Sequence, residues 1–425
     1  MPGGPVREAS RSRPAGTTFR RMSDPLSLNV QHLKPSETLA ISAAAKKRRA
    51  AGEQVFDLSV GEPDFDTPAP VVQAGIAAMQ RGMTRYPPNA GIPELRRAMA
   101  AHLSRLSKGR EVDPDRIIVS SGSKQAIFNA CFTLFGPHDK VLIPTPAWVS
   151  YPQIVHLTRA EPVLVPGDVE WSLKVSVRDL DKHVAKLTRG LILCSPSNPT
   201  GAVYTLTELK AIAEWAHAHG IWIIADEIYR RINYGPGSAP SFLDLPDELL
   251  ERVVVIYGAS KAYAMTGWRI GAALAPPKVV AGMAAMQSHT TSGANHPAQW
   301  AAAAAFEDER VEAEVLRMVA AFRRRRDTLV ERFRATAPGV EFVDPLGAFY
   351  FFFRVDGIGD GSMTGTAFCE RLMNEEGVAL VPGAAFGDDR WVRLSYATSD
   401  RELEAALDRL LRFIGRAAEA PVRVG

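Results

Sequence analysis

From about residue 114 onward, short and continuously apolar runs alternate with segments of helical spacing. Runs rich in β-branched residues are predicted to be strands, and they cover residues 116–120, 140–144, 190–194, 222–226 and 253–257. Residues 205–220 are the clearest amphipathic helix, with Thr205 or Thr207 near its start and Gly220 at its end. Strands that are apolar throughout and separated by helices predict an α/β fold with a mainly parallel sheet covered on both faces.

The same pattern divides the chain into four parts. Residues 1–22 are rich in Pro, Gly, Ser and Arg and are expected to be disordered. A transit peptide shares part of that composition, but the segment lacks an amphipathic period, which favours a solvated extension. Residues 23–70 are too short to fold alone and are expected to join the small domain and the subunit interface. Residues 71–305 are predicted to be a large α/β domain and residues 306–425 a smaller α+β domain.

A long charged helix is predicted near the start of the smaller domain, from about Glu307 to Thr336. It contains the run "RRRRD" at residues 323–327. Charge runs on a helix are usually solvated, so we expect this run to face solvent.

Composition narrows the class of protein. The 425 residues are 46% hydrophobic, and 50 Lys plus Arg against 47 Asp plus Glu give a net charge of +3. This near-balance argues against a nucleic-acid partner, and no apolar run approaches the ~20 residues of a membrane helix. Three cysteines in apolar surroundings form neither a disulfide framework nor a zinc spacing, which indicates a reducing cytoplasm. The nine histidines show no metal-ligand spacing, so no metal is expected.

Polar residues follow almost every predicted strand. Ligands of open parallel sheets bind at the carboxyl ends of the strands, so these residues together predict a site. They are Ser121–Lys124, Trp148, Ser197–Gly201, Asp226, Tyr229, Ser260 and Lys261.

Several of these residues have both a chemical and a structural interpretation. Gly122 and Ser123 lie between a strand and a helix, where backbone N–H groups bind an anion such as phosphate, although Ser is also a common helix cap. Asp226 ends a buried strand and needs a cation or strong donor, either a protonated cofactor nitrogen or a structural ion pair. Lys261 is either a desolvated amine able to form a Schiff base or a surface lysine.

Two arginines stand among apolar residues, where a guanidinium pairs with phosphate or carboxylate. Arg269 lies in "TGWRIG" and Arg393 in "WVRLSYA". For Arg393, an edge-strand ion pair is the alternative.

The motifs, taken in order, resemble a class I, fold type I aminotransferase that uses pyridoxal 5'-phosphate, and most of all the bacterial aspartate aminotransferase branch called Ib. The resemblance runs from about Gln31 to the last helix. It is carried by "VGEPDFDTP" (60–68), "RYPPNAGIPELR" (85–96), "PAWVSYP" (146–152), "SPSNPTGAVY" (195–204), "DEIY" (226–229), "SKAYAMTGWRIG" (260–271) and "VRLSYA" (392–397).

The resemblance implies a catalytic role for Lys261, which would form the Schiff base with the cofactor and then carry a proton as general base and acid. Asp226 would keep the pyridine nitrogen protonated, Asn198 and Tyr229 would bond the ring 3-oxygen, and Trp148 would flank the ring. The residues that the resemblance assigns to the cofactor are Tyr86, Gly122, Ser123, Lys124, Trp148, Asn198, Asp226, Tyr229, Ser260, Lys261 and Arg269. Tyr86 would reach the phosphate of the neighbouring subunit, which implies a homodimer.

The implied reaction is ping-pong transfer of an amino group from L-aspartate to 2-oxoglutarate. Arg393 would grip the substrate α-carboxylate while the Gly61 backbone closes over the substrate. The residues assigned to the substrate are Lys34, Ser36, Thr38, Gly61, Lys124, Trp148, Asn198 and Arg393.

This chain departs from the family pattern at two places. Gly258 stands where many members have Ser, three residues before the lysine, so the phosphate would rely more on Ser123, Ser260 and Arg269. Residues 287–300 contain no Arg to read the second carboxylate of the substrate. Lys124 and Lys34 are the candidates for that task, helped by Ser36 and Thr38, and Lys34 raises the hypothesis of prephenate as a substrate.

Other functions stay open at this point. An aromatic or alanine-type aminotransferase, or a lyase, could use the same scaffold. An aminotransferase-like regulator with a DNA-binding segment is disfavoured because the N-terminal residues show no helix-turn-helix pattern. A Rossmann dehydrogenase is disfavoured because no GxGxxG follows an early strand.

Overall fold

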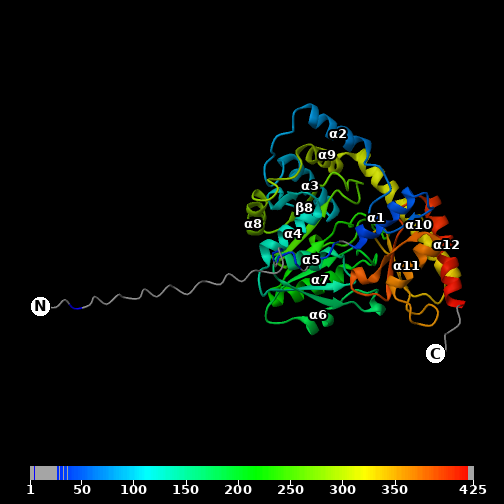
Figure 1. Ribbon diagram of the computed structural model, residues 1–425. Coiled ribbons are helices and arrows are strands. Elements are labelled where there is room, and N and C mark those ends of the chain that lie inside the picture. The colour runs from blue at the N-terminus through cyan, green and yellow to red at the C-terminus, as the bar shows by residue number, and fades with distance from the viewer. Residues whose placement is uncertain (1–3, 5–25, 28, 32, 36, 420–425) are drawn as a thin grey trace.

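The computed structural model describes residues 4, 26–27, 29–31, 33–35 and 37–419 of the chain (Figure 1). The expected disorder of residues 1–22 therefore falls outside the described residues, apart from Gly4. Within the described residues, the structure contains no helix whose length and apolar character would let it cross a membrane.

A seven-stranded sheet forms the centre of the larger part of the molecule, in the order β2-β8-β7-β6-β5-β3-β4. All neighbouring strands are parallel except those that pair with β8, which runs antiparallel to β2 and β7. The predicted mainly parallel sheet is thus confirmed. The strands are β2 (Ile117–Ser120), β3 (Lys140–Thr145), β4 (Glu161–Pro166), β5 (Thr188–Cys194), β6 (Trp222–Asp226), β7 (Val253–Gly258) and β8 (Gly271–Leu274).

Helices cover both faces of this sheet, as the continuously apolar strands predicted (Figure 1). Alternate residues of one strand enter two different cores: Ile223 belongs to the core that also contains residues of α3, α7 and α9, and Ile224 to the core that contains residues of α4, α5 and α8. The helices of this part are α2 (Ala69–Gln80), α3 (Pro93–Leu106), α4 (Ser123–Leu134), α5 (Ser150–Leu157), α6 (Val177–His183), α7 (Leu206–His219), α8 (Pro277–Ser288) and α9 (His296–Glu307). Helix α7 begins after a Thr205 capping box and ends at Gly220, where the sequence placed its ends.

The C-terminal part contains a second sheet of four antiparallel strands, in the order β12-β13-β10-β9. Its strands are β9 (Phe342–Val343), β10 (Tyr350–Arg354), β12 (Val381–Pro382) and β13 (Trp391–Ser395). Its helices are α10 (Glu309–Thr336), α11 (Gly365–Glu376) and α12 (Asp400–Glu419). A separate aromatic-rich core joins the sheet to these helices. The long charged helix begins at Glu309 and not Glu307, because Asp308 caps it after α9 has ended.

The N-terminal segment packs against the C-terminal part of the chain. Strand β1 (Phe56–Asp57) pairs in parallel with β11 (Val378–Ala379), and α1 (Glu37–Ala50) contacts both. The Arg48 side chain of α1 donates to the Met373 carbonyl and to Asn374 Oδ1 of α11, both at 3.1 Å, so segments from opposite ends of the chain meet here; α1 is blue in Figure 1. The domain boundaries at residues 70 and 305 and the subunit interface stay predictions.

Short 3-10 helices complete the fold at Pro114–Arg116, Val169–Trp171, Phe242–Asp244, Asp247–Leu250 and Gly383–Phe386.

One expectation about α10 is wrong for a single residue, Arg325. The run at residues 323–327 was expected to face solvent, but Arg325 is only 8% exposed and is ion-paired to Asp64 and Asp400. Its neighbours Arg323 and Arg324 are exposed, as expected. Arg325 is buried because it falls on the apolar stripe of α10, between Phe322 and Leu329.

Candidate active site

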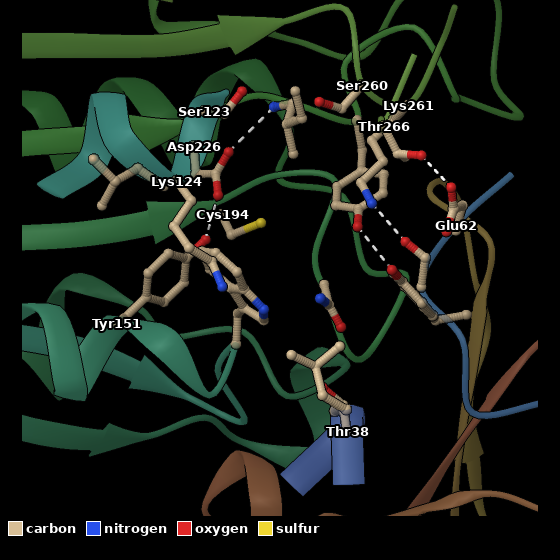
Figure 2. A pocket seen from close by; sticks show the side chains of 18 of the residues that line it. Thr38, Glu62, Ser123, Lys124, Tyr151, Cys194, Asp226, Ser260, Lys261 and Thr266 are labelled. Carbon is tan, nitrogen blue, oxygen red and sulfur yellow. Dashed lines mark hydrogen bonds between the residues drawn. The ribbon is translucent and has the colours of Figure 1, made fainter. Parts of the chain in front are cut away.

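A cavity of about 320 Å³ opens at the carboxyl ends of the central strands (Figure 2). It lies where β5, β6 and β7 end and where the loops after β2 and β3 begin, which is the position expected for a ligand of a parallel sheet. The predicted site residues that line it are Thr38, Gly61, Ser123, Lys124, Trp148, Asn198, Asp226, Tyr229, Ser260, Lys261, Arg269 and Arg393.

Lys261 follows β7 and points into the cavity. Its Nζ donates a hydrogen bond of 2.5 Å to the Gly61 carbonyl, and it lies 5.7 Å from the centre of the Tyr229 ring. Burial lowers the pKa of Lys261 to about 8, and the nearby Glu62 carboxylate acts in the opposite direction. A greater share of this amine is therefore neutral near physiological pH than in an ordinary lysine, which favours a nucleophilic role.

Asp226 ends β6 and is 4% exposed. Its Oδ2 accepts a 2.6 Å hydrogen bond from the Tyr151 hydroxyl, and its Oδ1 accepts a weaker one from the Ile228 amide (Figure 2). Burial raises the pKa of Asp226 above that of an ordinary aspartate, and the hydrogen bond from Tyr151 opposes the rise. Such a carboxylate can accept a hydrogen bond from a positively charged donor bound in the cavity.

The loop between β2 and α4 lies against Arg269. We call Gly122, Ser123 and Arg269 the anion cradle, because together they could bind a negatively charged group. Gly122 caps α4 with a φ of +85°, and a Cβ at that position would collide with the Arg269 guanidinium. Arg269 itself has a φ of +57°, which is unusual for a residue other than glycine, and its Nη1 donates to the Thr266 carbonyl at 2.9 Å. The free N–H groups of α4, the Ser123 hydroxyl and Arg269 thus converge on one place.

The packing around Gly258 explains why glycine stands here, where many members of the family have serine. A Cβ at this position would lie 2.6 Å from the Ser123 Oγ and 3.0 Å from the Gly271 Cα. The Ser123 hydroxyl, which donates to the Tyr257 carbonyl at 3.2 Å, occupies the space that a serine side chain at position 258 would need.

Arg393 is 2% exposed and comes from β13 of the smaller sheet. Its Nη1 donates to Asn198 Oδ1 at 3.0 Å and its Nη2 donates to the Ser59 carbonyl at 2.6 Å. Among the described residues, its buried Nε has no hydrogen-bond partner. A buried guanidinium with a donor left over, in the wall of a cavity, is suited to a carboxylate.

Two further pairs shape the cavity wall. The Lys124 ammonium lies 4.9 Å from the centre of the Trp148 ring, and burial, with a smaller effect of Arg269, lowers the pKa of Lys124. The Tyr229 hydroxyl is hydrogen-bonded to the Tyr350 hydroxyl at 2.7 Å. Aromatic rings thus border the cavity on two sides.

Two of the predicted residues, Tyr86 and Lys34, do not line this cavity, and Gly122 adjoins it. Tyr86 is 89% exposed and does not line the cavity. Lys34 lines an adjoining cavity of about 480 Å³, of which Lys124 also forms a wall. Ser36 lies outside the described residues. Gly122 contributes through its backbone, next to Arg269.

Sequence reasoning did not identify several residues that line the cavity, namely Glu62, Tyr151, Cys194, Thr266 and Tyr350. Glu62 belongs to the motif at residues 60–68 and Tyr151 to the motif at residues 146–152. These motifs indicated the region of the site but did not predict the contacts of the two side chains. The Glu62 carboxylate accepts a hydrogen bond from the Thr266 hydroxyl (Figure 2).

The donor set fits the predicted cofactor. Asp226 offers a buried carboxylate to a ring nitrogen, Lys261 offers a partly neutral amine to an aldehyde, and the cradle at Gly122, Ser123 and Arg269 offers donors to a phosphate. Among the described residues, no group of three or more His, Cys, Asp or Glu side chains could hold a metal ion.

Comparison with known proteins identifies the family. Residues 53–410 match the family described as "Aminotransferase class I and II". A bifunctional aspartate aminotransferase and glutamate/aspartate-prephenate aminotransferase of Petunia hybrida is 44% identical, covering 91% of this chain and 82% of that protein. An aspartate aminotransferase of Geobacillus stearothermophilus is 41% identical over 92% of this chain and 98% of the relative. Among solved structures, the aspartate aminotransferase of Thermus thermophilus with maleate has a TM-score of 0.86 at 39% identity, covering 92% of this chain and 99% of the other.

The shared fold, the match along nearly the whole chain and the donor set of the cavity agree with the resemblance seen in the motifs. The chain belongs to the class I and II aminotransferases, and it is a pyridoxal-phosphate-dependent transferase that acts on amino acids and 2-oxo acids.

Proposed function

We propose that this protein is an aspartate aminotransferase, which transfers the amino group of L-aspartate to 2-oxoglutarate and yields oxaloacetate and L-glutamate. The observation that carries the proposal is that the cavity wall contains Arg393 and Lys124 in addition to Lys261 and Arg269, the two basic residues that we assign to the cofactor. Aspartate and 2-oxoglutarate each carry two carboxylates, so a pair of cations suits both. The relatives described above carry the same activity in their names.

The site residues take the following roles in this proposal. Bound in the cavity, pyridoxal phosphate supplies a protonated pyridine ring that draws electrons from the substrate α-carbon. Asp226 holds the proton on the ring nitrogen. Lys261 Nζ removes the proton from the substrate α-carbon and delivers it to the cofactor C4′. Asn198 and Tyr229 would hold the ring 3-oxygen, and Trp148 would flank the ring; all three line the cavity.

The phosphate binds at the N-terminus of α4. The backbone N–H groups after Gly122, the Ser260 hydroxyl and the Arg269 guanidinium would donate to its oxygens, and the Ser123 hydroxyl would join them by turning its proton away from the Tyr257 carbonyl. Fixing the phosphate at this place orients the ring between Lys261 and its other partners.

Arg393 binds the substrate α-carboxylate as a planar fork, and the Gly61 backbone closes over the substrate. Lys124 binds the second carboxylate together with Thr38, which lines the same cavity. Ser36 completes this subsite in the proposal.

A substrate panel tests the function. Purified protein loaded with pyridoxal phosphate should show an absorbance band that aspartate shifts, and oxaloacetate should form when 2-oxoglutarate is present. A large excess of activity with an aromatic or aliphatic donor over aspartate would contradict the proposal and assign an aromatic or alanine-type aminotransferase.

Prephenate is a second candidate substrate, because Lys34 and Lys124 both line the adjoining cavity of about 480 Å³, which could receive a larger dicarboxylate. The name of the Petunia relative includes this activity. Replacing Lys34 with alanine should lower activity toward prephenate more than toward aspartate. Full prephenate activity in that variant would remove this hypothesis.

A homodimer in which Tyr86 reaches the phosphate of the other subunit is part of the proposal, and the 89% exposure of Tyr86 leaves it available to a partner. Complementation tests this arrangement. The variants Tyr86→Ala and Lys261→Ala should each be impaired alone, while a mixed dimer of the two should regain one intact site. Mixing that restores nothing would argue against a shared site.

We also propose a cytoplasmic location, because all three cysteines, Cys131, Cys194 and Cys369, are free thiols. Fractionation of cells that express the chain tests it, and recovery in an oxidising compartment would contradict it.

A further inference from the structure

Arg325 joins three segments that are distant in the sequence. It lies in the middle of α10, where its Nε donates to Asp400 Oδ1 at 2.6 Å and its Nη1 donates to Asp64 Oδ1 at 2.8 Å. Its side chain is 8% exposed, whereas those of Asp64 and Asp400 are 21% and 59% exposed. A buried guanidinium shared by two carboxylates fixes their relative position more firmly than a surface pair would.

The first carboxylate belongs to the segment that covers the active-site cavity. Asp64 is three residues after Gly61, whose carbonyl accepts the hydrogen bond from Lys261, and two after Glu62, which accepts one from Thr266. Figure 2 shows Glu62 and Lys261 on the same side of the cavity. Holding Asp64 therefore holds the backbone that lines this wall.

The second carboxylate begins α12, which follows the strand that carries Arg393. The covering segment and that strand are also joined directly, because Arg393 donates to the Ser59 carbonyl at 2.6 Å and the Ser395 amide donates to the Leu58 carbonyl at 2.9 Å. Arg325 is thus linked to both elements that the proposed function assigns to the substrate α-carboxylate, namely the segment that contains Gly61 and the strand that carries Arg393.

Aromatic packing holds the guanidinium in place. It lies 5.4 Å from the centre of the Phe65 ring and 5.7 Å from that of Phe322, and these two rings meet edge to face. Phe322 packs against Phe349, whose ring centre is 5.8 Å from the Lys261 Nζ. A continuous series of side chains therefore connects Arg325 to the reactive lysine, although Arg325 does not line the cavity.

We propose that Arg325 is a positioning residue: it fixes residues 61–65 against the strand of Arg393 and thereby sets the affinity of the site for the substrate α-carboxylate. The inference rests on the proposed function only for the identity of that subsite. Because every amino-acid substrate has an α-carboxylate, it does not depend on aspartate being the preferred donor.

The test compares Arg325→Met with Arg325→Lys and with Arg324→Met, which changes an exposed arginine of the same helix. The full-length protein loaded with pyridoxal phosphate is assayed for kcat, for KM of the amino-acid donor, and for binding of succinate as an unreactive dicarboxylate. Arg325→Met should raise KM and the succinate Kd about tenfold, as expected for one lost charge-assisted contact, with kcat changed less than about threefold. Arg325→Lys should be intermediate, and Arg324→Met should match the wild type.

Three results would overturn the inference. One is an unchanged KM and succinate Kd in Arg325→Met. Another is a parallel loss of kcat, succinate binding and cofactor affinity with a lower melting temperature, because that pattern belongs to a general structural role. If Arg325→Met fails to fold, Asp64→Asn removes the same link from the other side, and an unchanged succinate Kd in that variant would also refute the inference. Failure of the proposed function would appear separately, as a wild-type protein that does not use aspartate.

Discussion

The Tyr151 hydroxyl donates a 2.6 Å hydrogen bond to the Asp226 carboxylate, and both side chains are buried beside the cavity. Tyr151 lies on α5, which follows β3, whereas Asp226 ends β6 and is 75 positions away in the sequence, so the contact depends on the tertiary fold. Burial raises the pKa of Asp226, and the hydrogen bond from Tyr151 is the largest of the interactions that favour the charged form of the acid, ahead of the Ile228 amide and the charge of Lys261. The tyrosine thus prepares the carboxylate for its proposed partner, the ring nitrogen.

Replacing Tyr151 with phenylalanine should weaken cofactor binding. Loss of the hydrogen bond raises the pKa of Asp226 further and leaves the buried carboxylate with one donor fewer, at a cost of about 1.5–3 kcal/mol for a bond to a charged group. We expect the Kd of pyridoxal phosphate to rise about tenfold or more, measured by absorbance titration of the apoprotein. Tyr204→Phe is the control, because that hydroxyl accepts a hydrogen bond from the Val175 amide and the side chain lies in a different core. Equal affinities in the two variants would contradict this view.

The pH dependence of cofactor incorporation should report the amine of Lys261. Its pKa is lowered from the ordinary lysine value to about 8, so the neutral, nucleophilic form increases up to about pH 8 and dominates above it. The rate at which the apoprotein takes up pyridoxal phosphate should rise about tenfold per pH unit below this value and level off above it. Stopped-flow absorbance measures that rate.

Glu62→Gln provides the matched variant for this measurement. The Glu62 carboxylate favours the protonated amine, so removing its charge should move the midpoint to lower pH. A midpoint near that of free lysine in the wild type, or an upward movement in the variant, would be inconsistent with a desolvated amine beside Glu62.

The strands and the residues at their ends could be predicted because both leave local signals. Strands buried on both faces appear as continuous apolar runs, and a polar residue such as Asp226 or Lys261 at the end of such a run stands out. The structure brings these residues into one cavity. Their places in the sequence predicted this, because the carboxyl ends of parallel strands lie at the same edge of a sheet.

Contacts between distant elements could not be predicted in this way. Tyr151 looks like an ordinary core residue of α5 until the fold places it against Asp226. The position of Lys34 depends on a contact with Gln153, which is 119 positions away in the sequence, and no periodic signal predicts that contact.

Arg325 is a different case, because a signal was present. Val315, Met318, Phe322, Arg325 and Leu329 recur at spacings of three and four and are all buried. The composition of residues 323–327 suggested a solvated face, whereas the helical period places one of the arginines on the buried stripe. Periodicity was the better guide to burial than charge at this position.

Substituting Gly258 with serine should impair the phosphate cradle. The new Cβ would lie 2.6 Å from the Ser123 Oγ, and overpacking of this kind typically costs about 1–3 kcal/mol. We expect a lower melting temperature and a weaker affinity for pyridoxal phosphate. The double variant Ser123→Gly with Gly258→Ser makes room for the new hydroxyl, so it should regain part of both properties. If the single variant is as stable as the wild type, the space at Ser123 is not the reason for glycine here.

Lys124→Met should change substrate choice more than overall activity. Lys124 is the cation in the cavity wall that we assign to the second carboxylate, so its loss should lower kcat/KM for aspartate about 10- to 100-fold, the range for one hydrogen bond to a charged group. Phenylalanine, which lacks that carboxylate, should be used as well as before. Because burial lowers the pKa of Lys124, the preference of the wild type for aspartate should also decline at a lower pH than an ordinary lysine would give. Lys210→Met, which alters a surface pair with Glu214, is the control. A proportional loss for both substrates would instead assign Lys124 to cofactor binding.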